Sequence, residues 1–98
     1  MANFRLSRDI AFLGGDLTVN AAEALHNFLL TLQANQGRLT VDLRGAEAWD
    51  SSSIQLLFAF IKSRPPRTVV WRNMPPEMAA DIRLMGFGNL LNEVSHER

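Results

Sequence analysis

Residues 41–57 read VDLRGAEAWDSSSIQLL, a strand pattern followed by a helix start, and they decide the expected fold. The strand is expected over Arg38 to Leu43, because this stretch is short, partly β-branched and bounded by a glycine on each side. The helix is expected to begin at Asp50 or at the serines after it, since each of these side chains can accept a hydrogen bond from the free amides of the first turn. Pro65-Pro66 ends the helix, because proline cannot continue it.

Strand and helix patterns alternate on both sides of this segment. The other expected elements are, in chain order, two short strands around a turn near residues 7–9, a first helix through Leu25 to Leu32, a strand at residues 68–71 and a third helix that opens at Pro75-Pro76-Glu77. Such units form right-handed crossovers onto parallel strands of one sheet, and the N-terminal hairpin makes that sheet mixed. The predicted fold class is α/β, with four or five strands, β-α-β-α-β-α crossovers and helices packed against the sheet.

Local signals predict the boundaries of the outer elements. Asn20 and Glu23 have the spacing of a capping box, which marks the start of the first helix. Gly86 is expected to end the third helix, residues 87–91 to add one more turn, and residues 92–98 to form a polar tail. The 98 residues therefore predict a single domain with a core over about residues 10–91.

Composition excludes several classes of function. Ten basic and ten acidic side chains give a formal charge of zero, so no long-range field gathers phosphate backbones and no nucleic acid partner is expected. Cysteine is absent, which is consistent with a reducing compartment and predicts a cytoplasmic protein. No stretch approaches the ~20 apolar residues of a spanning helix, so direct membrane insertion is not expected.

Few residues are available for catalysis. The two histidines, His26 on the first helix and His96 near the end, have no evident nucleophile or carboxylate partner. Asp42, Glu47 and Asp50 could form a carboxylate site, but solvated acids are more usual in such a strand end and loop. We therefore expect no enzyme activity, no catalytic residue, no metal site and no cofactor.

The run Asp50-Ser51-Ser52-Ser53 has more hydroxyl groups than one helix cap requires. Helical periodicity turns Ile54, Leu57, Phe58 and Ile61 inward and places Ser52, Leu56, Ala59 or Phe60, and Ser63 on the opposite side. Two interpretations remain open. Leu56 and Phe60 meet another part of the domain, or they form an exposed patch on which a protein partner docks beside the serines.

A phosphate on Ser52 would add about two negative charges at the positive end of the helix, where free amides and the dipole favour an anion. The fold should tolerate this charge. The partner would instead lose an apolar contact or meet repulsion, so the modification would act as a release signal.

Residues 41–57 resemble the signature of STAS domains, the family of bacterial anti-sigma factor antagonists. Leu13-Gly14-Gly15-Asp16-Leu17 is similar to the family's second strand and turn, and the segments from Asn73 to Pro76 and from Met85 to Phe87 are similar to its last strand-to-helix region. The resemblance covers about Ile10 to Leu91. It implies a mixed sheet flanked by helices and a regulatory role in protein binding.

The resemblance to the antagonists implies a role for each residue at the helix start. The phosphoacceptor would be Ser52, the partner would be an anti-sigma factor that is also a serine kinase, and the unphosphorylated form would capture it. The partner-binding residues would be Asp50, Ser51, Ser52, Ser53, Leu56 and Phe60. Ser53 stands where the family usually has glycine, and its side chain could crowd the approach of a kinase.

A second branch of the family is similar to this chain as well. It contains short STAS subunits that bind the cytosolic ATPase of phospholipid-trafficking ABC transporters through the same helix start, without phosphorylation. The short chain and the Met74-Pro75-Pro76 segment suit this branch. The sequence leaves open the choice between the two partners and the oligomeric state.

Overall fold

The computed structural model describes residues 1–35, 37–65, 68–88 and 95–97. Its elements are β1 (Asn3–Ser7), β2 (Ile10–Leu17), the short 3-10 helix η1 (Val19–Ala21), α1 (Ala22–Leu32), β3 (Leu39–Asp42), β4 (Ala46–Trp49), α2 (Ser51–Lys62), β5 (Val69–Arg72), α3 (Pro76–Leu84) and β6 (Ser95–Glu97). Strand and helix alternate as the sequence predicts.

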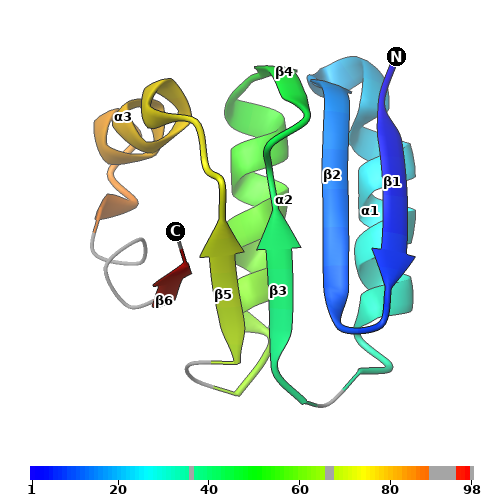
Figure 1. Cartoon of the computed structure of the whole chain (residues 1–98). Coiled ribbons are helices and arrows are strands. Elements are labelled where there is room, and N and C mark those ends of the chain that lie inside the picture. The colour runs from blue at the N-terminus through cyan, green and yellow to red at the C-terminus, as the bar shows by residue number, and fades with distance from the viewer. Residues whose placement is uncertain (36, 66–67, 89–94, 98) are drawn as a thin grey trace.

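The strands form one mixed sheet in the order β1-β2-β3-β5-β6 (Figure 1). β1 pairs with β2 antiparallel, as expected for the N-terminal hairpin, and the pairs β2-β3, β3-β5 and β5-β6 are parallel. β4 also pairs with β2, farther along it than β3 does, so β3 and β4 together act as one interrupted strand. The predicted α/β fold with a mixed sheet is confirmed.

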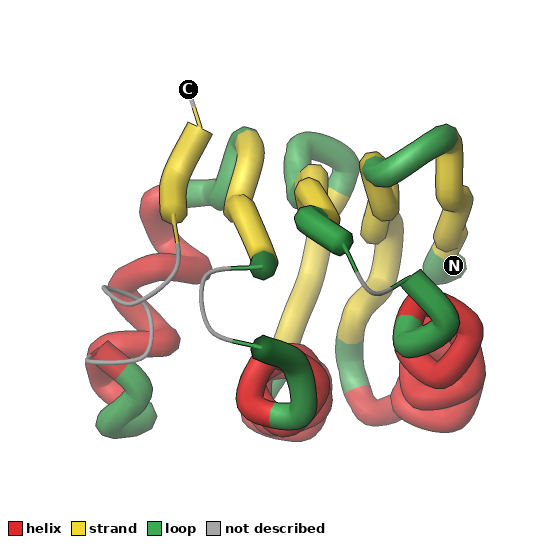
Figure 2. The backbone as a smooth tube through the Cα atoms, turned by 90° about the horizontal axis from the view of Figure 1, so that it is seen from below, coloured by secondary structure: helices red, strands yellow, loops and turns green. Residues whose placement is uncertain are grey.

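Both long helices cover the same face of the sheet, as the view along the strands shows (Figure 2). Alternate residues of β2 turn to that face, where Ala11, Leu13 and Leu17 are buried in the core. The central pair of this core is Phe58 of α2 and Trp71 of β5, whose ring centroids lie 5.9 Å apart. The opposite face carries no helix in the described part of the chain (Figure 1), and we call it the open face.

Three features of the described chain differ from the predictions: the start of α1, the strand β4 and the strand β6. Asn20 does not cap α1, because residues 19–21 form η1 first and the N-cap position falls on Ala21, which makes no side-chain hydrogen bond. β4 was not predicted, because it is only four residues long and none of its side chains is fully buried, so its sequence shows no buried run.

The polar tail was expected over residues 92–98, but residues 95–97 form β6 beside β5. The expected extra turn at residues 87–91 lies largely outside the described residues. Gly86 does end α3, with a φ of +87° that a residue with a Cβ adopts only at a cost.

None of the helices in the described ranges combines the length and the apolar character needed to cross a membrane.

Candidate functional site

The start of α2 is closed by a complete capping box. The Asp50 carboxylate accepts hydrogen bonds from the amides of Ser52 at 3.0 Å and Ser53 at 3.3 Å. In return, the Ser53 hydroxyl accepts the amide of Asp50 at 3.3 Å and donates to its carbonyl at 3.0 Å. The residue types at positions 50 and 53 therefore explain why the helix begins here.

The same carboxylate also joins α2 to a distant segment. Its second oxygen accepts the amide of Val19 in η1 at 2.8 Å. On the other side, the indole nitrogen of Trp49 donates to Asp81 of α3 at 2.7 Å. The helix start is thus tied to the η1 and α3 segments by Asp50 and its neighbour Trp49.

The Ser52 hydroxyl points back to this cap. It donates to the Asp50 carboxylate at 2.5 Å, and this hydrogen bond is the largest cause that holds the pKa of Asp50 below its ordinary value. Burial opposes this lowering of the pKa, and the hydrogen bonds from the amides of Val19, Ser53 and Ser52 add to it. Asp50 is therefore a carboxylate at neutral pH and accepts every hydrogen bond that reaches it.

The three serines differ in exposure. Ser51 is exposed, Ser52 is half-buried and Ser53 is buried, because a helix turns each successive side chain by ~100°. Val19, brought beside the cap by its amide, has a side chain that is 64% exposed. Together with the half-buried Leu56, these residues make a surface of hydroxyl and apolar groups. We call Val19, Asp50, Ser51, Ser52 and Leu56 the helix-start surface.

Phe60 was predicted to extend this surface, and that prediction is wrong. Its side chain is only 5% exposed and belongs to the core cluster, with the guanidinium of Arg64 over its ring at 5.4 Å. Arg64 in turn donates to the carbonyls of Leu32 and Gly37, at the end of α1 and just after it. The flank of α2 through Phe60 is therefore covered by the α1 region, which was the alternative interpretation. Ser53 likewise does not belong to the exposed surface.

The suggested carboxylate site does not form. Asp42 is buried and bonded to Arg72 and Asn73, Asp50 is bonded at the helix cap, and Glu47 is exposed. In the described ranges no cluster of three acidic, histidine or cysteine residues could hold a metal ion. His26 is exposed on α1.

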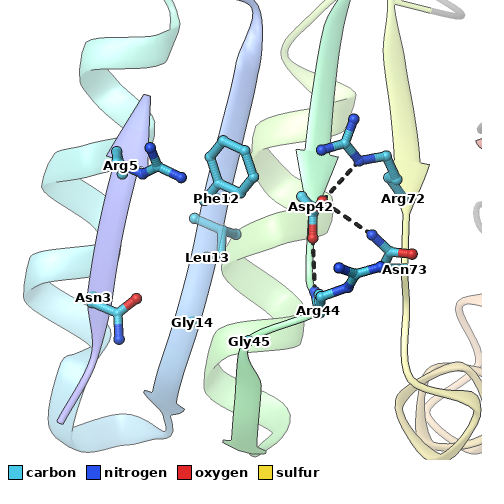
Figure 3. A pocket seen from close by; sticks show the side chains of 10 residues that line it. All are labelled: Asn3, Arg5, Phe12, Leu13, Gly14, Asp42, Arg44, Gly45, Arg72 and Asn73. Atoms are coloured by element: carbon cyan, nitrogen blue, oxygen red, sulfur yellow. Dashed lines mark hydrogen bonds and ion pairs between the residues drawn. The ribbon is translucent and has the colours of Figure 1, made fainter. Parts of the chain in front are cut away.

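A second site, on the open face, was missed by the sequence analysis. Arg5, Arg44 and Arg72 line a hollow together with Phe12 and Gly14 (Figure 3). The residues come from β1, the β3–β4 loop, β5 and β2, so no local motif unites them. Alternation of polar and apolar residues along β1 was the one available signal.

Comparison with known proteins identifies the family. A family model described as "Mlab, STAS domain" matches residues 7–92. The chain belongs to the STAS domain family. The capping box at Asp50 and the serines after it thus lie within the matched range, as does the whole helix-start surface. No curated protein matches the chain.

Solved structures with the same fold include regulatory STAS proteins. A Thermotoga maritima protein assigned as an anti-sigma factor antagonist aligns with a TM-score of 0.69 at 14% identity, over 99% of this chain and 86% of that one. The phosphorylated form of the Bacillus cell fate determinant SpoIIAA gives 0.61 at 16% identity, over 100% and 92% of the chains. The unphosphorylated form of the anti-sigma factor antagonist SpoIIAA gives 0.64 at 16% identity, over 100% and 88%. At these identities the likeness establishes a shared fold.

Proposed function

We propose that this STAS domain is a non-catalytic, cytoplasmic regulatory protein that binds a partner protein through the helix-start surface. The partner would be an anti-sigma factor that is also a serine kinase, and phosphorylation of Ser52 would release it. The observation that carries the proposal is the half-exposed Ser52 hydroxyl at the positive end of α2, flanked by exposed Ser51 and Val19.

The hydrogen bond between Ser52 and Asp50 gives this switch a physical mechanism. Phosphorylation removes the hydroxyl proton that Ser52 donates to Asp50 at 2.5 Å and places a dianion beside a carboxylate. Like charges at this separation repel, so the phosphoryl group turns outward, toward the partner. The two hydrogen bonds that the Asp50 carboxylate accepts from the backbone amides of Ser52 and Ser53 can persist, so the fold survives.

Ser53 does not oppose this mechanism. Its side chain is 1% exposed and its hydroxyl is used within the capping box, so it does not stand in the path of a kinase that approaches Ser52. The family's glycine at this position is thus replaced by a residue that adds no side chain to the exposed surface. The relatives named as anti-sigma factor antagonists, one of them solved in a phosphorylated form, are consistent with the proposal.

A second candidate is a subunit that binds the ATPase of an ABC phospholipid transporter. The favouring observations are Ser53, which stands where the antagonists usually have glycine, and the Met74-Pro75-Pro76 segment before α3. Binding to this type of partner would not require phosphorylation of Ser52. The two candidates use the same residues and differ in the partner and in the need for Ser52 phosphorylation.

Affinity capture from cells of the source organism tests both candidates. Tagged protein should retain a serine kinase of the anti-sigma class, identified by mass spectrometry, and Ser52→Asp should reduce its recovery at least ~10-fold, as a charge beside a desolvated contact does. Incubation of the captured kinase with ATP should add one phosphate to the protein and none to Ser52→Ala.

Asn27→Asp provides the control, since it adds the same charge on exposed α1. Recovery of an ABC ATPase with no phosphate transfer would favour the second candidate. Equal recovery of the kinase by Ser52→Asp and Asn27→Asp would contradict a role for the helix-start surface.

A further inference from the structure

A row of side chains crosses four strands of the open face. Arg5 of β1 lies opposite Phe12 of β2, Phe12 lies beside Asp42 of β3, and Asp42 lies beside Arg72 of β5. Side chains at paired positions point to the same face of a sheet. Phe12 therefore lies between two arginines, with the guanidinium carbons of Arg5 and Arg72 at 4.3 and 5.8 Å from its ring centroid.

Gly14 makes the hollow beside this row. It is paired with Asn3, and a Cβ at position 14 would stand 2.7 Å from the Asn3 amide oxygen and 3.4 Å from the carbonyl of Gly45. With no side chain there, a hollow of about 610 Å³ remains between β1 and the β3–β4 loop. This volume is in the range of sites for small organic molecules.

Asp42 holds one wall of the hollow in position (Figure 3). One of its oxygens accepts from Arg72 at 2.7 Å and from the Asn73 amide at 3.1 Å, and the other accepts the Arg44 backbone amide at 2.8 Å. Asn73 adopts a left-handed φ of 58°, a conformation that is uncommon for a residue with a side chain. Arg72 is thus held through its Nε, and among the side chains that the structure describes none bonds to its terminal nitrogens.

The charges around the hollow are unbalanced. Its lining contains three arginines and one acid, and that acid is already satisfied by Arg72, Asn73 and the Arg44 amide. In the described part of the chain, the side chains of Arg5 and Arg44 form no ion pair. The lining of the hollow therefore carries an excess of two positive charges, in a protein whose formal charge is zero.

We propose that this hollow binds a small organic oxyanion, a phosphate monoester or a carboxylate, whose apolar part contacts Phe12. Guanidinium groups present planar forks of N–H donors that match both oxyanions, and three arginines line this hollow. The size of the hollow favours a small molecule over a protein segment. The site lies on the open face and does not depend on the function proposed for the helix-start surface.

Titration of the ¹⁵N-labelled full chain with phenyl phosphate, phenylacetate and inorganic phosphate tests the proposal. At least one aromatic probe should shift the amide signals of Phe12, Gly14, Arg44 and Arg72. It should also bind at least ~10-fold tighter than inorganic phosphate, because inorganic phosphate has no apolar part to contact Phe12. The tighter of the two aromatic probes identifies the oxyanion.

Two variants separate charge from shape. The double variant Arg5→Ala with Arg44→Ala leaves the Asp42–Arg72 pair intact and should weaken binding at least ~10-fold, since it removes two charge-assisted contacts. Gly14→Ala keeps every charge but fills the floor of the hollow, displacing the flexible end of Asn3, and should weaken the aromatic probe more than inorganic phosphate. Arg38→Ala, exposed and outside the hollow, should leave binding unchanged.

The proposal is overturned if none of the three probes shifts these signals, or if the double variant binds as tightly as Arg38→Ala. It is equally overturned if the protein binds phosphatidylglycerol vesicles and ignores all three probes, because the open face would then recognise a membrane surface and not a small molecule.

Discussion

Asp50 is the residue on which the helix-start surface depends. Its carboxylate accepts two amides of α2, the Ser52 hydroxyl and the Val19 amide, so one side chain joins the helix cap to η1. A carboxylate that accepts this many hydrogen bonds stabilises the fold and also positions the helix-start surface. Loss of binding in a variant of Asp50 would therefore need a stability measurement beside it.

Asp50→Ala should lower the free energy of unfolding by about 1–2 kcal/mol, the range for removal of an N-cap side chain. Urea denaturation followed by circular dichroism measures the change. Ser51→Ala is the matched control, because Ser51 is exposed at the adjacent position and its side chain makes no hydrogen bond in the described part of the chain. An equal loss in both variants would show that the capping box does not stabilise α2.

At the scale of elements, α2 is covered on two sides. Ile54, Leu57 and Phe58 face the sheet, while Phe60 with Arg64 faces the end of α1. Periodicity identified the first side correctly, because the apolar spacing of one face is read directly from the sequence. It did not identify the second, since the position of α1 against α2 is a tertiary feature.

Phe60→Ala should lower the free energy of unfolding by about 3–5 kcal/mol, because it leaves a cavity and removes the ring beneath Arg64. Leu30→Ala on α1, where the side chain is 51% exposed, should change it by less than about 0.5 kcal/mol. Thermal and urea denaturation give both values. A small loss at Phe60 would mean that this flank of α2 is open in solution and available to a partner.

Elements at the edges of the sheet were the hardest to predict. β4 and β6 are short. The strands with which they pair, β2 and β5, lie far from them in the chain. The strands β3 and β5 were predicted to within a residue or two, because both are short, contain β-branched residues and lie between glycine or proline residues.

For the whole molecule, the lowered pKa values of Asp42 and Asp50 connect stability to pH. Burial of Asp42 alone would raise its pKa, but the hydrogen bonds from the Arg44 amide, Arg72 and Asn73 outweigh it and lower the pKa below the ordinary value. The pKa of Asp50 is lowered as well, and the hydrogen bond from the Ser52 side chain is the largest cause. The unfolded chain therefore binds more protons than the folded one in acid, so stability is fully present above the ordinary carboxyl value and is lost as pH falls through the lowered values.

We expect the free energy of unfolding to be nearly constant near neutral pH and to fall below about pH 4. Asp42→Asn should lower it at pH 7 and should flatten this acid dependence, because the ion pair with Arg72 is then absent at every pH. Urea midpoints between pH 2.5 and 7 measure the effect. Glu47→Gln, an exposed position, is the control, and an unchanged slope in Asp42→Asn would exclude the buried pair as the cause.

The arrangement in one helical layer and one sheet leaves two separate surfaces for function. The helix-start surface lies at the carboxyl ends of the strands, and the basic hollow lies on the open face (Figures 1 and 3). Each can be altered by a variant that leaves the other intact, such as Ser52→Asp or Arg5→Ala.

The order of strands and helices and the cap at Asp50 followed from the sequence alone, because each rests on local spacing and side-chain chemistry. The family was indicated by the resemblance of residues 41–57 to the STAS signature. The tertiary structure alone decided that Phe60 is covered, that Val19 joins the helix-start surface and that three arginines line one hollow beside Phe12. These features depend on contacts between segments 30 or more residues apart, and no local pattern encodes the distance between such segments.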